Sequence, residues 1–380
     1  MAPKKKTDGE QDFSLPATAV LAAFDEYQHI KCVSLMKGGR VGNVLSTGSL
    51  IQDLILGGGY QRGRIADIFG PEGTGKTSLL NETMASAQRV GIPTVFYDTE
   101  HSADVTYMRT QGVDPEFRIK ENGKSVPGFF YVQPGPGEDV YRHIAKSLQR
   151  MPDINLEKSG PPTILYAIDS LAAMFSESED MDKQGKGGLG LDARMHSVWL
   201  RRLRNLLRSK GGLLVLTNQI RMAINLRNPA MNKAGQPGGN ALKFYADYMM
   251  RVSASRREQD DAIGVARQHL FLSTIKNKCF PPFRDAELDL ILGRGLDKAS
   301  DAEHFLKAIG RYEVKGAYRR IKLKKFDTGK GMHWKDFRKI TESPEFREYA
   351  FEMMKDERVY GAYFKQSKYK NFTYDVEGAE

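Results

Sequence analysis

One stretch of eight residues constrains the fold of this 380-residue chain more than any other feature. Gly70-Pro-Glu-Gly-Thr-Gly-Lys-Thr77 matches the pattern G-x-x-x-x-G-K-[ST]. A strand-like run over residues 65–69 precedes it, and a helical pattern over residues 78–90 follows it. In that setting the glycines let backbone N–H groups surround phosphate oxygens at the positive end of a helix. The stretch therefore predicts a nucleotide-phosphate site, and the alternative is a glycine-rich turn that fits the pattern by chance.

Two carboxylates are expected at the same site. Residues 163–168 read as a buried strand that runs directly into Asp169, which with the Thr77 hydroxyl forms the predicted Mg²⁺ site. Residues 94–97 read as another strand, and they lead to Glu100. A carboxylate there either orients a water at the terminal phosphate or is an ordinary exposed acid. The predicted phosphate-loop residues are Gly70, Pro71, Glu72, Gly73, Thr74, Gly75, Lys76, Thr77 and Ser78.

Short β-branched runs alternate with longer helical patterns between about residues 41 and 298. The predicted buried strands are residues 65–69, 94–97, 163–168 and 213–217. Strands separated by helices indicate crossover connections and a mostly parallel sheet. The predicted fold class is therefore α/β.

Two further segments flank this core. Residues 1–40 contain three consecutive lysines, a helical pattern over residues 15–26 and a strand-like piece over residues 32–36. The lysines either touch nucleic acid or only solubilise the terminus. Residues 299–380 read as a small α+β C-terminal domain, and residues 311–339 within it carry eleven basic and three acidic side chains.

Composition excludes several classes of protein. Apolar residues make up 40% and charged residues 27% of the chain, which is typical of a folded globular protein and not of a disordered one. No apolar run approaches the ~18–20 residues of a membrane span. Two cysteines cannot form a disulfide framework, which predicts a reducing, cytoplasmic compartment. The formal charge of +10 permits a polyanionic partner.

Several blocks of sequence resemble the RecA family of recombination proteins, and they occur in the family's order over about residues 17–295. These blocks are Leu45-Ser-Thr-Gly-Ser-Leu50, Phe96-Tyr-Asp-Thr-Glu-His-Ser-Ala-Asp104, Asn218-Gln-Ile-Arg-Met222, Gly238-Gly-Asn-Ala-Leu-Lys-Phe-Tyr245 and Lys276-Asn-Lys278. The tail from Gly316 through Trp334 is similar to the family's small C-terminal domain. The resemblance implies a RecA-like P-loop NTPase core over residues 41–298, with residues 1–40 as a polymerisation element.

The resemblance also implies catalytic roles. Glu100 would be the catalytic base, and Gln219 would sense the γ-phosphate and couple nucleotide state to DNA affinity. Lys276 and Lys278 would reach the ATP of a neighbouring subunit as a charge clamp. Without the resemblance, two such lysines at a strand end would be read as solvated. With Lys76 of the phosphate loop, these residues form the expected catalytic set.

Adenine recognition is implied for two residues. Tyr107 would stack on the base and Asp104 would accept from its amino group, and their i, i+3 spacing places both on one helix face. The alternative for Tyr107 is a half-buried core tyrosine.

Two segments, residues 178–191 and 220–240, are predicted to bind single-stranded DNA. From Arg221 to Lys243 there are four basic residues and no acid, so backbone and arginine groups can lie along phosphates. A helix starting near Asp192 presents a basic stripe, which is either a solvated face or a phosphate contact. Leu189 stands where the family commonly has a wedging methionine. The predicted DNA-binding residues are Leu189, Arg194, Ser197, Arg201, Arg221, Met222, Ile224, Gly238, Gly239 and Asn240.

These expectations describe an ATP-dependent DNA recombinase that uses ATP and Mg²⁺. Its partners would be single-stranded DNA, homologous duplex DNA and further copies of the chain in a helical filament, with no membrane partner. Two alternatives remain open: a ring helicase with a RecA core, and an ATP-gated protein that coats single-stranded DNA.

Overall fold

The computed structural model describes residues 44–121, 123–154, 160–177, 191–223, 233–235, 241–260, 265–356, 359–360 and 363. The expected polymerisation element in residues 1–40 lies outside these residues. Within them, none of the helices combines the length and the apolar character needed to cross a membrane.

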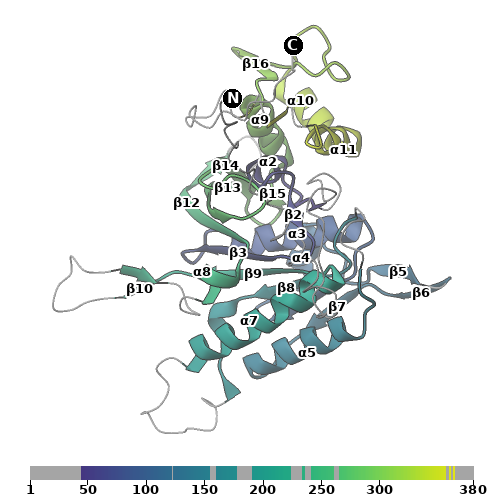
Figure 1. The fold of residues 1–380 in the computed structure, drawn as a ribbon. Coiled ribbons are helices and arrows are strands. Elements are labelled where there is room, and N and C mark those ends of the chain that lie inside the picture. The colour runs from purple at the N-terminus through teal and green to yellow at the C-terminus, as the bar shows by residue number, and fades with distance from the viewer. Residues whose placement is uncertain are drawn as a thin grey trace, which may run out of the picture.

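A nine-stranded sheet in the order β15-β14-β13-β12-β3-β9-β8-β4-β7 forms the centre of the molecule (Figure 1). The six strands from β12 to β7 run parallel, and β13, β14 and β15 extend the sheet in antiparallel fashion. This confirms the predicted α/β class with a mostly parallel sheet. The strands are β3 (Ile65–Gly70), β4 (Thr94–Asp98), β7 (Phe129–Val132), β8 (Leu165–Asp169), β9 (Leu213–Gln219), β12 (Tyr248–Asp260), β13 (Val265–Asn277), β14 (Asp285–Ile291) and β15 (Gly295–Leu296).

Helices cover both faces of the sheet. In Figure 1, α5 (Gly137–Gln149) and α7 (Leu191–Lys210) lie on one side, and α3 (Lys76–Arg89) and α4 (Val105–Thr110) lie on the other. Alternation along β3 divides the core accordingly: Ala66 and Ile68 pack in the cluster with α3, whereas Ile65 and Phe69 pack in the cluster with α5 and α7. Burial on both faces explains why such strands read as continuous apolar runs.

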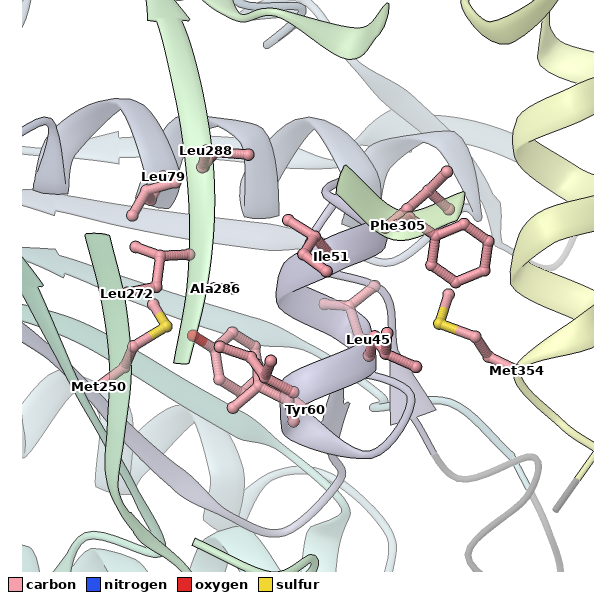
Figure 2. Packing of buried hydrophobic residues seen from close by; sticks show 14 of the residues in the cluster. Leu45, Ile51, Tyr60, Leu79, Met250, Leu272, Ala286, Leu288, Phe305 and Met354 are labelled. Carbon is pink, nitrogen blue, oxygen red and sulfur yellow. The ribbon is translucent and has the colours of Figure 1, made fainter. Parts of the chain in front are cut away.

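The C-terminal elements share a hydrophobic cluster with the sheet. They are α9 (Lys298–Ala308), β16 (Tyr312–Lys315), β17 (Tyr318–Ile321), α10 (Trp334–Thr341) and α11 (Pro344–Met353). Figure 2 shows Phe305 and Met354 facing α2 (Leu50–Leu56), next to Ile51 and Leu45. The apolar contact is therefore continuous across residue 299, and the division of the chain at that residue stays a prediction.

Polar contacts fasten the same junction. Asp301 of α9 accepts hydrogen bonds from the backbone N–H groups of Leu50 (2.9 Å) and Ile51 (3.1 Å), at the start of α2. Arg347 of α11 pairs with the same carboxylate at 2.7 Å and donates to the carbonyl of Gly48 at 2.6 Å. Since a helix N-terminus carries unpaired N–H groups and partial positive charge, Asp301 links α2, α9 and α11.

Smaller elements complete the description. A hairpin of β5 (Arg118–Glu121) and β6 (Lys124–Pro127) projects away from the sheet (Figure 1). A second hairpin, β10 (Arg221–Ala223) with β11 (Lys233–Gly235), follows β9 directly. The others are β1 (Val44–Leu45), paired with β2 (Tyr60–Gln61), the 3-10 turn η2 (Leu171–Ala173) and α8 (Ala241–Tyr245).

Candidate active site

The predicted phosphate loop joins the end of β3 to the first turn of α3. Gly73 and Gly75 have φ angles of 67° and 81°, a left-handed conformation that favours glycine. A Cβ atom on Gly70 would lie 2.1 Å from the carbonyl oxygen of Val252 in β12, so a larger residue cannot fit there. The Lys76 ammonium donates to the carbonyl of Pro71 at 2.6 Å. Backbone N–H groups and one lysine thus converge at the N-terminus of a 14-residue helix, an arrangement that fits a polyphosphate.

Asp169, at the end of β8, lies against this loop. The Thr77 hydroxyl donates to one carboxylate oxygen at 2.7 Å, and the Thr217 hydroxyl of β9 donates to the other. Burial raises the pKa of Asp169, and the two hydroxyl donors oppose that effect. A threonine hydroxyl beside a carboxylate supplies the hard oxygen ligands that Mg²⁺ prefers, so the residues fit this cation.

Thr217 was not found from the sequence. In the run over residues 213–217 a threonine is an ordinary strand former, and its contact with Asp169 arises from the pairing of β8 with β9. Gln268 of β13 was also missed. Its side-chain amide donates to the carbonyl of Gly73 at 3.0 Å, although 195 residues separate the two.

Glu100 and Gln219 lie together beside Asp169. One Glu100 oxygen accepts hydrogen bonds from the Ser170 hydroxyl at 2.5 Å and from the Gln219 side-chain amide at 3.4 Å. The Glu100 backbone N–H donates to the carbonyl of Asp169 at 3.3 Å. Gln219 is the register partner of Gly70, so the pairing of β9 with β3 fixes it next to the phosphate loop. The arrangement can hold a water molecule near a terminal phosphate and accept its proton.

The charge of Lys76 depends on these neighbours. Burial lowers the pKa of its ammonium, and the carboxylates of Asp169, Glu100 and Glu72 act in the opposite direction. The site thus couples the lysine to three acids at the same edge of the sheet.

The expected adenine residues lie beside α3. The Tyr107 hydroxyl is 3.3 Å from the Ser78 hydroxyl, which also accepts a hydrogen bond from the Gln111 side-chain amide at 3.1 Å. Tyr107 is half-buried. Asp104 precedes α4, which begins at Val105, so it stands at the helix N-terminus three residues ahead of Tyr107 and not inside the helix. Asp104 is the N-cap, and its carboxylate accepts from the backbone N–H groups of Thr106 and Tyr107, a role that aspartate fills well.

Lys276 and Lys278 lie at the other edge of the sheet. Asn277 pairs with Tyr248, which itself pairs with Ala66 near the start of β3, whereas the phosphate loop follows the end of β3. The fold therefore separates these lysines from the phosphate loop of their own chain.

The expected DNA-binding residues are described in part. On α7, Arg194 and Arg201 are exposed and Ser197 is half-buried. On the opposite, apolar face of α7, Met195 and Leu203 are buried, and Trp199 and Leu206 pack against the same cluster. For Arg221 and Met222 the structure describes the backbone, which belongs to the β10–β11 hairpin. Leu189, Ile224, Gly238, Gly239 and Asn240 lie outside the described residues.

The fold and this site define a P-loop nucleotide-binding protein. The phosphate loop and Asp169, at the end of the separate strand β8, lie together at the carboxyl edge of a mostly parallel sheet. A family model described as the RecA N-terminal domain matches residues 30–297. The chain belongs to the RecA family, a family of DNA recombination and repair.

Curated relatives agree with this assignment. The chain is 36% identical over 280 residues to Protein RecA of Syntrophus aciditrophicus strain SB, covering 72% of this chain and 74% of that protein. It is 35% identical over 260 residues to Protein RecA of Campylobacter fetus subsp. fetus strain 82-40, with 68% of each chain covered. It is also 35% identical over 282 residues to Protein RecA of Thermus thermophilus, covering 73% of this chain and 75% of that one.

Proposed function

We propose that this chain is an ATP-dependent DNA recombinase that forms filaments on single-stranded DNA and exchanges strands with homologous duplex DNA. One observation carries the proposal. Gln219 contacts Glu100 at the phosphate loop and is followed at once by the β10–β11 segment, which is the expected second DNA-binding segment. A change at the nucleotide can therefore reach that segment through one side chain.

Different residues of the chain have separate roles in binding and hydrolysing ATP. Lys76 and the loop N–H groups bind the phosphates of ATP, and Glu100 orients the attacking water and accepts its proton. Thr77 and Asp169 would hold Mg²⁺, which when bound neutralises charge on the phosphate oxygens. Lys276 and Lys278 act on the ATP of the next subunit, since their own phosphate loop lies at the opposite edge of the sheet.

The test is ATP hydrolysis without DNA, with single-stranded DNA and with duplex DNA. We expect single strands to stimulate wild type and Glu100→Gln to lose about 10²-fold or more in kcat, as for loss of a general base. Gln219→Ala should bind nucleotide yet lose the stimulation.

Gln133→Ala is the matched control, because Gln133 is an exposed glutamine that follows β7 of the same sheet. It should be stimulated like wild type. A wild-type rate that does not respond to DNA contradicts the proposal. Stimulation without strand exchange supports a coating protein, and directional unwinding without homology supports a ring helicase.

A further inference from the structure

Three cations from three parts of the fold meet on one buried carboxylate oxygen at the amino edge of the sheet. The Oδ1 atom of Asp247 lies 3.3 Å from Arg64 Nη1, 3.5 Å from Lys278 Nζ and 3.6 Å from an Arg204 Nη atom. Arg64 precedes β3, Arg204 belongs to α7 and Lys278 follows β13. These are long-range contacts that short sequence motifs do not reveal.

Asp247 is itself held rigidly. Its side chain is 1% exposed, and its backbone N–H donates to the carbonyl of Ile65 at 2.8 Å. The backbone N–H of Lys278 donates to the carbonyl of Asp247 at 3.0 Å. The carboxylate is thus a fixed point, whereas the side chains of Arg64, Lys278 and Arg204 are 27%, 33% and 36% exposed and reach toward solvent.

Lys276 joins the same group from the end of β13. Its ammonium donates to the carbonyl of Lys243, and burial together with the charges of Lys278 and Arg204 lowers its pKa, while Asp247 opposes that effect. Four cations and one carboxylate leave this cluster with an excess of three positive charges. Without the carboxylate, the cations would repel one another and the lysines would lose their fixed positions.

We propose that Asp247 is a positioning residue that holds Lys278 and Arg204 toward the triphosphate of the neighbouring subunit, and that Arg204 is a further cation of that clamp. The inference rests on the proposed function, in which Lys276 and Lys278 act between subunits. Its physical basis is preorganisation: long cationic side chains stabilise a phosphoryl group best when their positions are fixed before the reaction.

The experiment compares Asp247→Asn, Asp247→Glu and Asp301→Asn with wild type. We expect Asp247→Asn to lower the DNA-stimulated kcat about tenfold, because the clamp acts on developing charge, with nucleotide affinity of the DNA-free chain unchanged. Asp247→Glu, which keeps the charge, should recover part of the rate. Arg204→Gln should reproduce the loss of kcat.

Asp301 is the matched control, because it is equally buried and paired with an arginine but lies at the α2 junction. Asp301→Asn should lower the urea midpoint as much as Asp247→Asn does, and leave kcat near the wild-type value. A mixture of Asp247→Asn with Lys76→Ala should regain activity at about a quarter of the sites, by random mixing along a head-to-tail contact.

Each outcome decides a separate point. If DNA stimulates wild type and Asp247→Asn equally, the positioning role is wrong and the proposed function stands. If kcat falls equally in Asp301→Asn, the effect is one of stability and the positioning role is again wrong. If DNA does not stimulate wild type, the proposed function fails, and the inference fails with it.

Discussion

Asp67 lies in the strand that leads to the phosphate loop, yet neither of its carboxylate oxygens has a hydrogen-bond partner. The side chain is 1% exposed, and the sheet register places it between Leu216 of β9 and Met249 of β12. Burial alone raises the pKa of Asp67 well above its usual range. Folding therefore favours the neutral form of this acid.

Because folding shifts the pKa of Asp67, the free energy of unfolding depends on pH. An acid whose pKa is raised by folding contributes stability below its unfolded pKa of about 4, and that contribution is lost as pH rises through the folded pKa. We expect the unfolding free energy of wild type to fall as the pH rises from about 4 through the folded pKa of Asp67. Asp67→Asn is neutral at every pH, so this variant should lose a smaller amount of stability over the same rise in pH. Urea unfolding between pH 4 and pH 9 measures this. Glu348→Gln, at an exposed carboxyl of α11, should follow wild type; if Asp67→Asn does too, the interpretation is wrong.

At the scale of single elements, α7 presents two different faces. Met195, Leu200, Leu203 and Leu207 are buried against the sheet, whereas a basic stripe faces outward. Arg194 lies in the first turn of the helix and Arg201 near its middle, whereas Arg208 lies on the stripe near the C-terminal end. The predicted first DNA-binding segment precedes α7 in the sequence. We therefore expect single-stranded DNA bound there to contact Arg194 and Arg201 but not Arg208.

Salt dependence tests this geometry. Each phosphate contact adds about one unit to the slope of log affinity against log salt concentration. We expect Arg194→Ala and Arg201→Ala each to reduce the slope for single-stranded DNA by about one unit. Arg208→Ala is the control on the same helix and should leave the slope unchanged. If all three variants keep the wild-type slope, the stripe is a solvated face that makes no phosphate contact.

The elements differ in how far sequence alone predicts them. β3, β4, β8 and β9 are buried on both faces, so they appear as continuous apolar runs and were predicted. β12 and β13 are longer, but β13 alternates buried Leu270 and Leu272 with exposed Phe271 and Ile275, and no continuous run marks it. The phosphate loop, Asp169 and Glu100 follow from motif and strand position. Thr217 and Asp247 do not, because their partners come from distant elements.

At the scale of the whole molecule, one apolar cluster extends from α2 to Tyr363, and the strands beneath it bear the second cluster on their other face. The two tryptophans of the chain report on these two regions. Trp199 stacks on Tyr141 beneath α7, and Trp334 stacks on Phe337 in the C-terminal part. Shared packing of this kind predicts cooperative unfolding.

We therefore expect one unfolding transition for both regions. Trp334→Phe leaves the fluorescence of Trp199, and Trp199→Phe leaves that of Trp334. In urea, the two single-tryptophan variants should unfold at the same midpoint once each is corrected for its own change in stability, measured by circular dichroism. Separate midpoints would show that residues 299–380 unfold independently, as a domain of their own.

The phosphate loop and the cation cluster lie at opposite edges of the sheet, and this arrangement determines how many complete sites a row of copies contains. If the phosphate loop of one copy is completed by the cation cluster of the next, a row of n copies contains n − 1 complete sites. One terminal copy then keeps an uncompleted phosphate loop and the other an unused cation cluster, so the two ends of the row differ chemically. The turnover per copy would rise with the length of the row, and exchange of copies would be unequal at its two ends.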